Sequence, residues 1–198
     1  NAEGGLAAAL IGLGDAKAQK RDRFLAAAAM RKLPSGVYQF ADGLAGAALE
    51  EACLGWLLET YRFDRYAAQK PMAAQLVAPD GVDAERLEII AAGEFLTRDL
   101  INTPASDMGP DDLEAAARSL ANTHQAKIDI TTGDALLAAN FPMIHAVGRA
   151  ADRAPRLIDM RWGKAGPKLT LVGKGVCFDT GGLNIKPGAS MGLMKKDM

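Results

Sequence analysis

The chain has 198 residues, of which 49% are apolar and 24% are charged. These values are typical of globular proteins and exclude a disordered chain, and the length is enough to bury a core. The net charge of −1 argues against a general polyanion-binding surface. Two cysteines, Cys53 and Cys177, argue against a disulfide scaffold, and two histidines, His124 and His145, exclude a zinc site built from several histidines.

The chain carries no signal for a membrane or for secretion. No apolar run reaches the roughly 18 to 20 residues that span a bilayer, and the longest candidate, 44–58, is interrupted by Glu50 and Glu51. The first residues lack the basic leader of a signal peptide. Because the chain opens on Asn1 and stops at Met198 without an obvious closing element, it reads as a piece of something longer.

The first part of the chain predicts a small α/β domain. Apolar patterning predicts strands at 6–13, 36–40 and 72–78, helices at 16–32 and 44–61, and a loop at 61–70. Pro79-Asp80-Gly81 is a strong turn signal. We place a domain boundary there, so that residues 1–81 form a partial N-terminal domain.

The second part alternates helices and strands. The patterns predict a linker helix over 82–103, helices at 111–121 and 133–139, and strands at 127–132, 143–147, 156–162 and 168–172. This alternation is typical of an α/β domain with a central mixed or mostly parallel sheet. We expect residues 104–198 to be the start of that second domain.

Polar residues gather after the last predicted strand. The strand at 169–172 runs into a glycine-rich turn, and Lys174, Asp179, Lys186 and Asp197 follow. In α/β sheets, ligands bind at the carboxyl ends of strands, and glycines allow close backbone approach. Two carboxylates suit divalent metals, and a lysine joins them only as the neutral amine. A second lysine that stays charged can stabilise an oxyanion.

Other interpretations of these residues remain open on local grounds. Gly173-Lys174-Gly175 resembles a phosphate-binding turn, but it lacks the spaced glycines and the Lys-Ser/Thr pair of a P-loop. Taken singly, Lys186 is typical of a solvated surface and Asp179 of a turn. His145 is expected on an apolar strand as a hydrogen-bonded structural residue. Cys177 has no activating histidine near it in sequence and is expected to be a buried apolar residue.

Residues 172–198 resemble the metal-site segment of the leucyl aminopeptidase (cytosol aminopeptidase) family. The stretch V-G-K-G-V-C-F-D-T-G-G-L-N-I-K-P, followed by M-G-L-M-K-K-D-M, keeps the spacing of the family signature. Residues 100–110, L-I-N-T-P-A-S-D-M-G-P, are similar to the N-T-P-A-N-x-M-x-P stretch of that family. Residues 141–150 and 153–162 resemble bacterial members, and residues 1–59 fit only loosely.

The resemblance implies roles for single residues. Lys174, Asp179 and Asp197 match metal ligands of a two-metal centre. Lys186 matches the catalytic lysine that polarises the scissile carbonyl, and together with Asp179 it also belongs to the implied substrate site. Met194 matches a methionine that lines the pocket for the N-terminal side chain of the substrate.

The resemblance also implies what the whole enzyme does. A metal-dependent aminopeptidase releases N-terminal amino acids such as leucine from peptides, with Zn²⁺ or Mn²⁺ activating a water molecule. The implied assembly is a cytoplasmic homohexamer, and residues 104–198 would begin its catalytic domain. A DNA-binding regulator or an inactive structural homologue of the same fold is the alternative, although the near-zero net charge does not favour nucleic acid as a partner.

Part of the family site does not occur in these residues. The remaining Asp and Glu ligands, and the arginine that holds a bicarbonate, belong to an N-T-D-A-E-G-R stretch that is absent from the 198 residues. Smaller departures are Ser190, where many relatives have Asn, and Gly192, where many have Asp.

We therefore expect the isolated polypeptide 1–198 to be inactive, because it carries about half of the implied ligands. The measurement is hydrolysis of leucyl-p-nitroanilide by the purified polypeptide with added Zn²⁺ or Mn²⁺. Detectable turnover would contradict this expectation.

Overall fold

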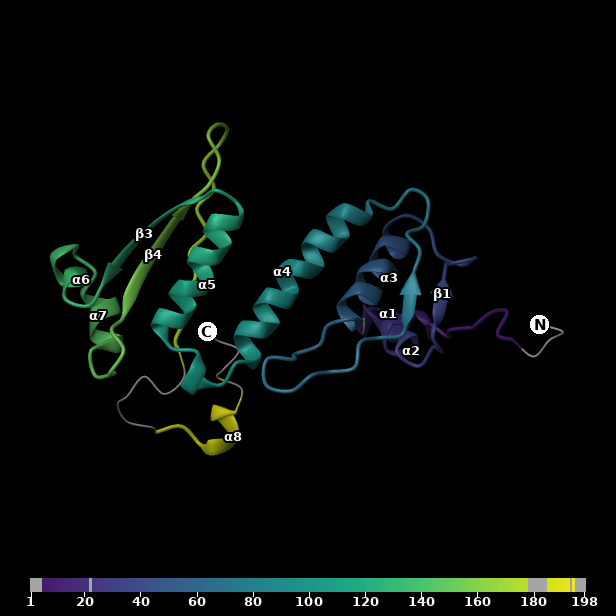
Figure 1. Cartoon of the computed structure of the whole chain (residues 1–198), viewed down its shortest axis with the longest axis horizontal. Helices are drawn as coiled ribbons and strands as arrows, with labels where there is room; N and C mark the ends of the chain where they lie inside the picture. Colours follow the sequence, from purple (N-terminus) through teal and green to yellow (C-terminus); the bar gives the residue numbers. More distant parts are fainter. Residues whose placement is uncertain (1–4, 22, 178–184, 193, 195–198) are drawn as a thin grey trace. The chain divides into compact units, whose positions relative to one another are not determined.

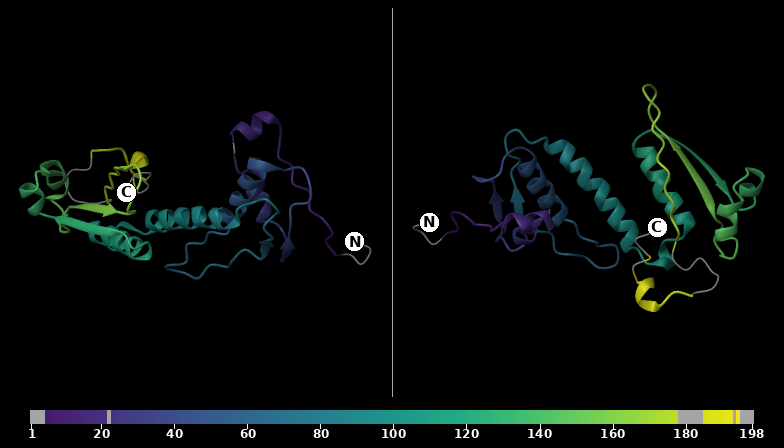
Figure 2. Two further views of the ribbon diagram at one scale, coloured as in Figure 1. Left: turned by 90° about the horizontal axis from the view of Figure 1, so that it is seen from above. Right: turned by 180° about the vertical axis from the view of Figure 1, so that it is seen from behind.

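The structure is a computed structural model that describes residues 5–21, 23–177, 185–192 and 194. It consists of two compact units, Asn1–Asp99 and Leu100–Met198, which are described separately below. Figures 1 and 2 show their elements.

The first unit combines helices with a short parallel pair of strands. Its elements are α1 (Ala16–Arg21), α2 (Leu25–Met30), β1 (Gly36–Tyr38), α3 (Gly46–Glu59), β2 (Ala74–Leu76) and most of α4 (Ala84–Asn102). β1 and β2 pair in parallel, with Gly36 opposite Ala74, and α2 packs on α3. Ala26, Met30, Trp56 and Ala74 form the buried core, which removes their apolar surface from water.

Two predictions for this unit need correction. Residues 6–13 form no strand, although Ile11 and Leu13 still pack against the core. This run is rich in alanine and glycine, which favour strands weakly, and it pairs with neither β1 nor β2. The helix predicted over 16–32 is divided into α1 and α2, because Phe24 leaves the helical conformation with φ −114° and ψ 34°.

Helix α4 begins where the turn signal predicts. Gly81 adopts φ +81°, the left-handed conformation that favours glycine, and the Val82 N–H donates to the Pro79 carbonyl at 3.2 Å. The Asp83 carboxylate then accepts the Arg86 N–H at 3.0 Å and caps the helix. Among the described residues, no helix is long and apolar enough to cross a bilayer.

The second unit packs helices on an antiparallel pair of strands. Its elements are the 3-10 turn η1 (Ala105–Asp107), α5 (Pro110–Thr123), β3 (Lys127–Thr132), α6 (Ala135–Ala138), α7 (Pro142–Gly148), β4 (Arg156–Arg161) and α8 (Gly188–Met191). β3 pairs with β4 from Lys127 opposite Arg161 to Thr132 opposite Arg156. α5 contacts both strands, α6 contacts β3, and α7 contacts β4.

Residues 143–147 form helix α7 and not the predicted strand. Pro142 occupies the first turn of α7, where its missing N–H and its fixed φ favour a helix start. Exposure then follows a helical period, since Met143 and Val147 are exposed while Ile144 and Gly148 are covered. The apolar run was too short for its period to be recognised, and Pro142 is the signal that could have identified the helix.

The strand predicted at 168–172 is also wrong for the described structure. These residues are extended but form no ladder, and Leu169, Leu171 and Val172 are more than four-fifths exposed. A strand is stabilised by hydrogen bonds to a neighbour and by burial of its faces, and this segment has neither among the described elements.

The α/β class is confirmed, with one difference in detail. The strands described in the second unit pair antiparallel, whereas we expected a mixed or mostly parallel sheet. The predicted helices at 44–61, 82–103 and 111–121 and the strands at 36–40, 72–78, 127–132 and 156–162 all have counterparts. The division into domains at 81 and 103 stays a prediction.

Substitution by alanine is expected to have opposite effects on stability at two glycines. A Cβ on Gly148 would overlap the Cβ of Pro155 and lie 2.8 Å from its Cγ, whereas a Cβ on Gly93, within α4, meets nothing within 4 Å. We expect Gly148→Ala to destabilise the second unit by about 1–3 kcal/mol through overpacking.

Gly93→Ala is the matched control and should be neutral or stabilise the first unit by about 0.5–1 kcal/mol, because alanine favours a helix. Thermal melts followed by circular dichroism measure both changes. Equal melting temperatures for the wild type and Gly148→Ala would contradict the predicted collision.

Candidate metal-binding site

The structure describes three of the five site residues predicted from the sequence. Lys174 is exposed on the irregular segment after β4, Lys186 is exposed just before α8, and Met194 is half-buried. Asp179 and Asp197 lie outside the described residues. The described residues therefore include one of the three predicted metal ligands, Lys174, together with Lys186 and Met194.

The chemistry of the predicted donor set fits a divalent metal. One amine and two carboxylates are suitable ligands for Zn²⁺ or Mn²⁺, with oxygen as the main donor atom. Elsewhere in the described residues, no group of three or more His, Cys, Asp and Glu side chains is placed to hold a metal ion. Residues 5–21, 23–177, 185–192 and 194 thus contain no second group of these side chains that would be an alternative to the predicted metal site.

The chain turns back after β4 before it reaches Lys174. Gly163 and Gly166 adopt φ +87° and +98°, which only glycine accepts readily, so the reversal is short. The returning segment is drawn yellow-green in Figure 1. Its residues 163–175, Lys174 included, are all exposed.

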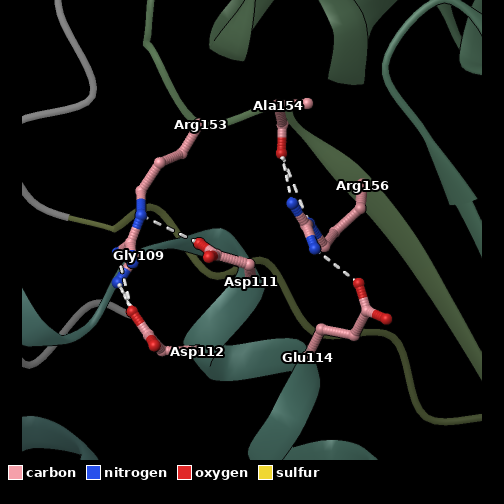
Figure 3. A network of polar contacts seen from close by, with 7 residues as sticks. All are labelled: Gly109, Asp111, Asp112, Glu114, Arg153, Ala154 and Arg156. Atoms are coloured by element: carbon pink, nitrogen blue, oxygen red, sulfur yellow. Dashed lines mark hydrogen bonds and ion pairs between the residues drawn. The ribbon is translucent and has the colours of Figure 1, made fainter.

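Arg153 connects the start of α5 with the residues that precede β4. Its Nε lies 3.0 Å from Asp111 Oδ1, and its Nη1 donates to Asp112 Oδ2 at 2.6 Å (Figure 3). The same Asp112 oxygen accepts the Gly109 N–H at 2.9 Å and so caps the helix. A Cβ on Gly109 would overlap Nη1 of Arg153, so the guanidinium lies directly against the backbone.

Arg156, the first residue of β4, makes the second connection to α5. Its Nη1 donates to Glu114 Oε2 at 2.5 Å, and both side chains are largely buried, at 12% and 15% exposed. The other Glu114 oxygen accepts from Arg118 Nε at 2.7 Å. These bonds to Arg118 and Arg156 lower the pKa of Glu114 and hold it ionised.

We call Asp111, Asp112, Glu114, Arg153 and Arg156 the α5–β4 clamp. Our interpretation of the sequence predicted the helix at 111–121 but identified neither arginine as its partner. The signal was present as opposite charge, because Asp152-Arg153-Ala154-Pro155-Arg156 pairs two cations with the acidic residues after Pro110. Charge alone does not say which side chains meet, since the pairs are about 40 residues apart in the chain.

The remaining candidates have structural surroundings. His145 lies on α7, with Nε2 3.2 Å from Asp134 Oδ1, so the expected hydrogen bond is confirmed and the expected strand is wrong. Cys177 is buried, as expected, and so is Cys53. Burial and the charge of Glu50 raise the pKa of Cys53, which disfavours its reactive thiolate.

Two family profiles together match most of the chain. Residues 95–198 match the profile described as "Cytosol aminopeptidase family, catalytic domain", and residues 1–79 match "M17 aminopeptidase, N-terminal domain". The chain belongs to the cytosol aminopeptidase family. The match to the catalytic-domain profile includes the whole predicted metal segment.

Curated relatives carry the same name. The chain is 38% identical to a "Probable cytosol aminopeptidase" of Rhizobium rhizogenes over 77% of its length and 37% identical to one of Chelativorans sp. over 96%. It spans 34% and 43% of the length of these two relatives.

The chain is also similar to several solved structures. The chain is 43% identical to the cytosol aminopeptidase of Coxiella burnetii, with a TM-score of 0.80 over 88% of this chain and 38% of that one. The bottromycin maturation enzyme BotP, solved in complex with Mn, is 31% identical with a TM-score of 0.68 over 84% and 38%. Leucyl aminopeptidase of Trypanosoma brucei in complex with actinonin is 28% identical, also at 0.68, over 84% and 35%.

The lowered pKa of Glu114 predicts a pH-dependent contribution to stability. In the unfolded chain this carboxylate is protonated near its ordinary pKa of 4.5. In the folded chain the arginines stabilise the ionised carboxylate, so that its pKa is lower and protonation requires a lower pH. The contribution of Glu114 is therefore complete above that value and is lost as the pH falls through the folded pKa.

The measurement is urea unfolding of the wild type and Glu114→Gln from pH 7 to pH 3. We expect the difference in the free energy of unfolding between the wild type and Glu114→Gln to decrease as the pH falls. Glu88→Gln, which changes an exposed carboxylate of α4, is the control and should follow the wild type throughout. A constant difference between wild type and Glu114→Gln would contradict the assignment.

Proposed function

We propose that the full-length gene product is a metal-dependent aminopeptidase that releases N-terminal amino acids such as leucine from peptides. The observation that carries this proposal is the segment 172–198, which keeps the family signature with its internal spacing. That segment lies wholly inside the match to the family catalytic domain. The proposal therefore assigns to this chain the part of an aminopeptidase site that the segment 172–198 supplies.

In this proposal Lys174, Asp179 and Asp197 hold the metal ions. When bound, two divalent ions supply a binding site for the free amine of the substrate and an acidified water molecule. Lys174 is exposed, which leaves its amine accessible to a ligand. Zn²⁺ or Mn²⁺ suits this donor set, and Mn is present in the solved complex of the similar enzyme BotP.

Lys186 is the proposed catalytic residue. A charged amine near the scissile carbonyl stabilises negative charge on that oxygen as the peptide bond is attacked, and this effect is larger in the transition state than in the ground state. We also propose that Asp179 belongs to the substrate-binding residues. Met194, which is half-buried, contributes an apolar side chain to the pocket for the substrate's first residue.

Further properties belong to the same proposal. The enzyme acts in the cytoplasm as a homohexamer, and a bicarbonate takes part in proton transfer in the complete site. Residues 1–81 form the N-terminal domain, 82–103 a linker helix, and 104–198 the start of the catalytic domain. The ends of the two profile matches, at 79 and 95, support a boundary in this region.

The decisive variant is Lys186→Ala in the full-length gene product. Removing one group that stabilises an oxyanion costs roughly 10²–10³-fold in kcat. We therefore expect kcat for leucyl-p-nitroanilide to fall by that amount, while bound metal, measured by elemental analysis, is retained.

Lys168→Ala is the matched control, because Lys168 is an exposed lysine on the chain reversal that precedes the predicted ligands. It should hydrolyse the substrate at the wild-type rate. Wild-type turnover by Lys186→Ala would remove Lys186 from its catalytic role. Absence of any hydrolysis by the metal-loaded wild type, tested on leucyl and other aminoacyl substrates, would contradict the proposed function.

A further inference from the structure

Helix α4 carries apolar side chains on the side that faces away from the core of the first unit. Leu87 and Ala91 are buried and mark the core side. Ile89 and Leu96 are seven residues apart, about two turns, and lie on the opposite side, with Ala92 between them along the helix. Ile89 is 64% exposed, Ala92 is exposed and Leu96 is half-buried. We call Ile89, Ala92 and Leu96 the outer face of α4.

The chain is acidic where α4 begins. Residues 80–88 contain four acids and one cation: Asp80, Asp83, Glu85, Glu88 and Arg86. All five residues are exposed. The N-terminal end of the outer face therefore lies beside a segment with a net charge of −3.

A basic loop lies at the other end of the first-unit part of α4. The Tyr61 hydroxyl donates to Asp99 Oδ1 at 2.8 Å, and the Arg98 guanidinium lies 5.4 Å from the centre of the Tyr61 ring. The loop that follows Tyr61, residues 62–70, contains three cations and one acid: Arg62, Arg65, Lys70 and Asp64. Its net charge of +2 is thus held beside the end of the helix opposite to the acidic segment.

Arg62 fixes the shape of this basic loop. Its Nη1 donates to two carbonyls just before the loop, at 2.6 and 2.8 Å, and its Nε donates to the Lys70 carbonyl at 3.1 Å. Arg65 lies over the ring of Tyr66, which is 54% exposed. Tyrosine and arginine often carry much of the binding energy of a protein interface, and a loop of fixed shape loses little entropy on binding.

We propose that the outer face of α4 packs against the same face of a second copy of the chain, with the two helices antiparallel. Glu85 and Asp99 are 14 residues apart, roughly 21 Å along the helix, and Ala92 is their midpoint. The midpoint of Ile89 and Leu96 lies next to Ala92. A two-fold axis at this point brings Ile89 of each copy against Leu96 of the other. The same axis brings the acidic segment of each copy toward the basic loop of the other.

The charge distribution is what identifies the partner as a second copy. A surface that is negative at one end and positive at the other attracts a copy of itself in the antiparallel orientation and repels one in the parallel orientation. Complementary charges of this kind set the orientation of a pair, while apolar side chains at the centre supply the buried area. The inference rests on the homohexamer of the proposed function and deepens it, because it names a surface through which two copies meet.

The test is the mass of the full-length gene product, measured by light scattering after size-exclusion chromatography. We expect Ile89→Glu to halve the mass of the wild-type assembly, because it buries an unpaired carboxylate twice in a two-fold interface. Val37→Glu is the matched control, since Val37 lies on β1 of the same unit and is 68% exposed. It should keep the wild-type mass, and circular dichroism checks that each variant is folded.

Reversal of charge tests the antiparallel orientation separately. Glu85→Lys and Arg65→Glu should each lower the mass at a protein concentration at which the wild type stays assembled, because each places like charges together. The double variant Glu85→Lys/Arg65→Glu should regain the wild-type mass, because the two ends have then exchanged sign. Failure of the double variant to regain mass would overturn the antiparallel pairing.

The remaining outcomes distinguish the possible occupants of the outer face. An assembled wild type with an unchanged mass for folded Ile89→Glu overturns the pairing alone. A monomeric wild type overturns both the pairing and the homohexamer, while hydrolysis of aminoacyl substrates by the same sample decides the aminopeptidase proposal independently. If the thiol of Ile89→Cys in that monomer resists labelling by a maleimide, another part of the full-length chain covers the face.

Discussion

Ion pairs between α5 and the start of β4 hold together the described part of the second unit. Glu114 lies between Arg118 and Arg156, and the Arg156 pair is largely buried. Removing one partner of a buried pair leaves an uncompensated charge and costs about 3–5 kcal/mol. The two-stranded sheet is too small to be stable alone, so its packing on α5, and hence these pairs, is a condition for the rest of the unit.

Local patterns predicted most of the fold, because the elements concerned carry their own signals. Asp83 caps α4, the acidic residues after Pro110 begin α5, and the 127–132 strand alternates in exposure. The predictions failed where a partner elsewhere in the chain decides the outcome. Residues 6–13 and 168–172 are apolar enough for strands, but a strand requires a neighbour, and sequence patterns do not reveal whether one is present.

For the candidate site, too, local features could be predicted from the sequence and contacts between distant residues could not. Its residue types and spacing could be predicted because they lie close together along one segment, from Lys174 to Asp197. Its geometry could not, because contacts in the folded chain join residues from distant positions in the sequence. Arg153 meets Asp112 across 41 residues of chain, through folding of two different elements, and no short motif encodes that contact.

Family membership and the donor chemistry lead to one central claim, that Lys174 belongs to a two-metal centre. An anomalous difference map from crystals of the full-length gene product grown with Mn²⁺ tests it most directly. The account predicts two peaks roughly 3.5–4 Å apart, with Lys174 Nζ, Asp179 and Asp197 as ligands. Manganese bound elsewhere, or a Lys174 amine directed away from both peaks, would contradict it.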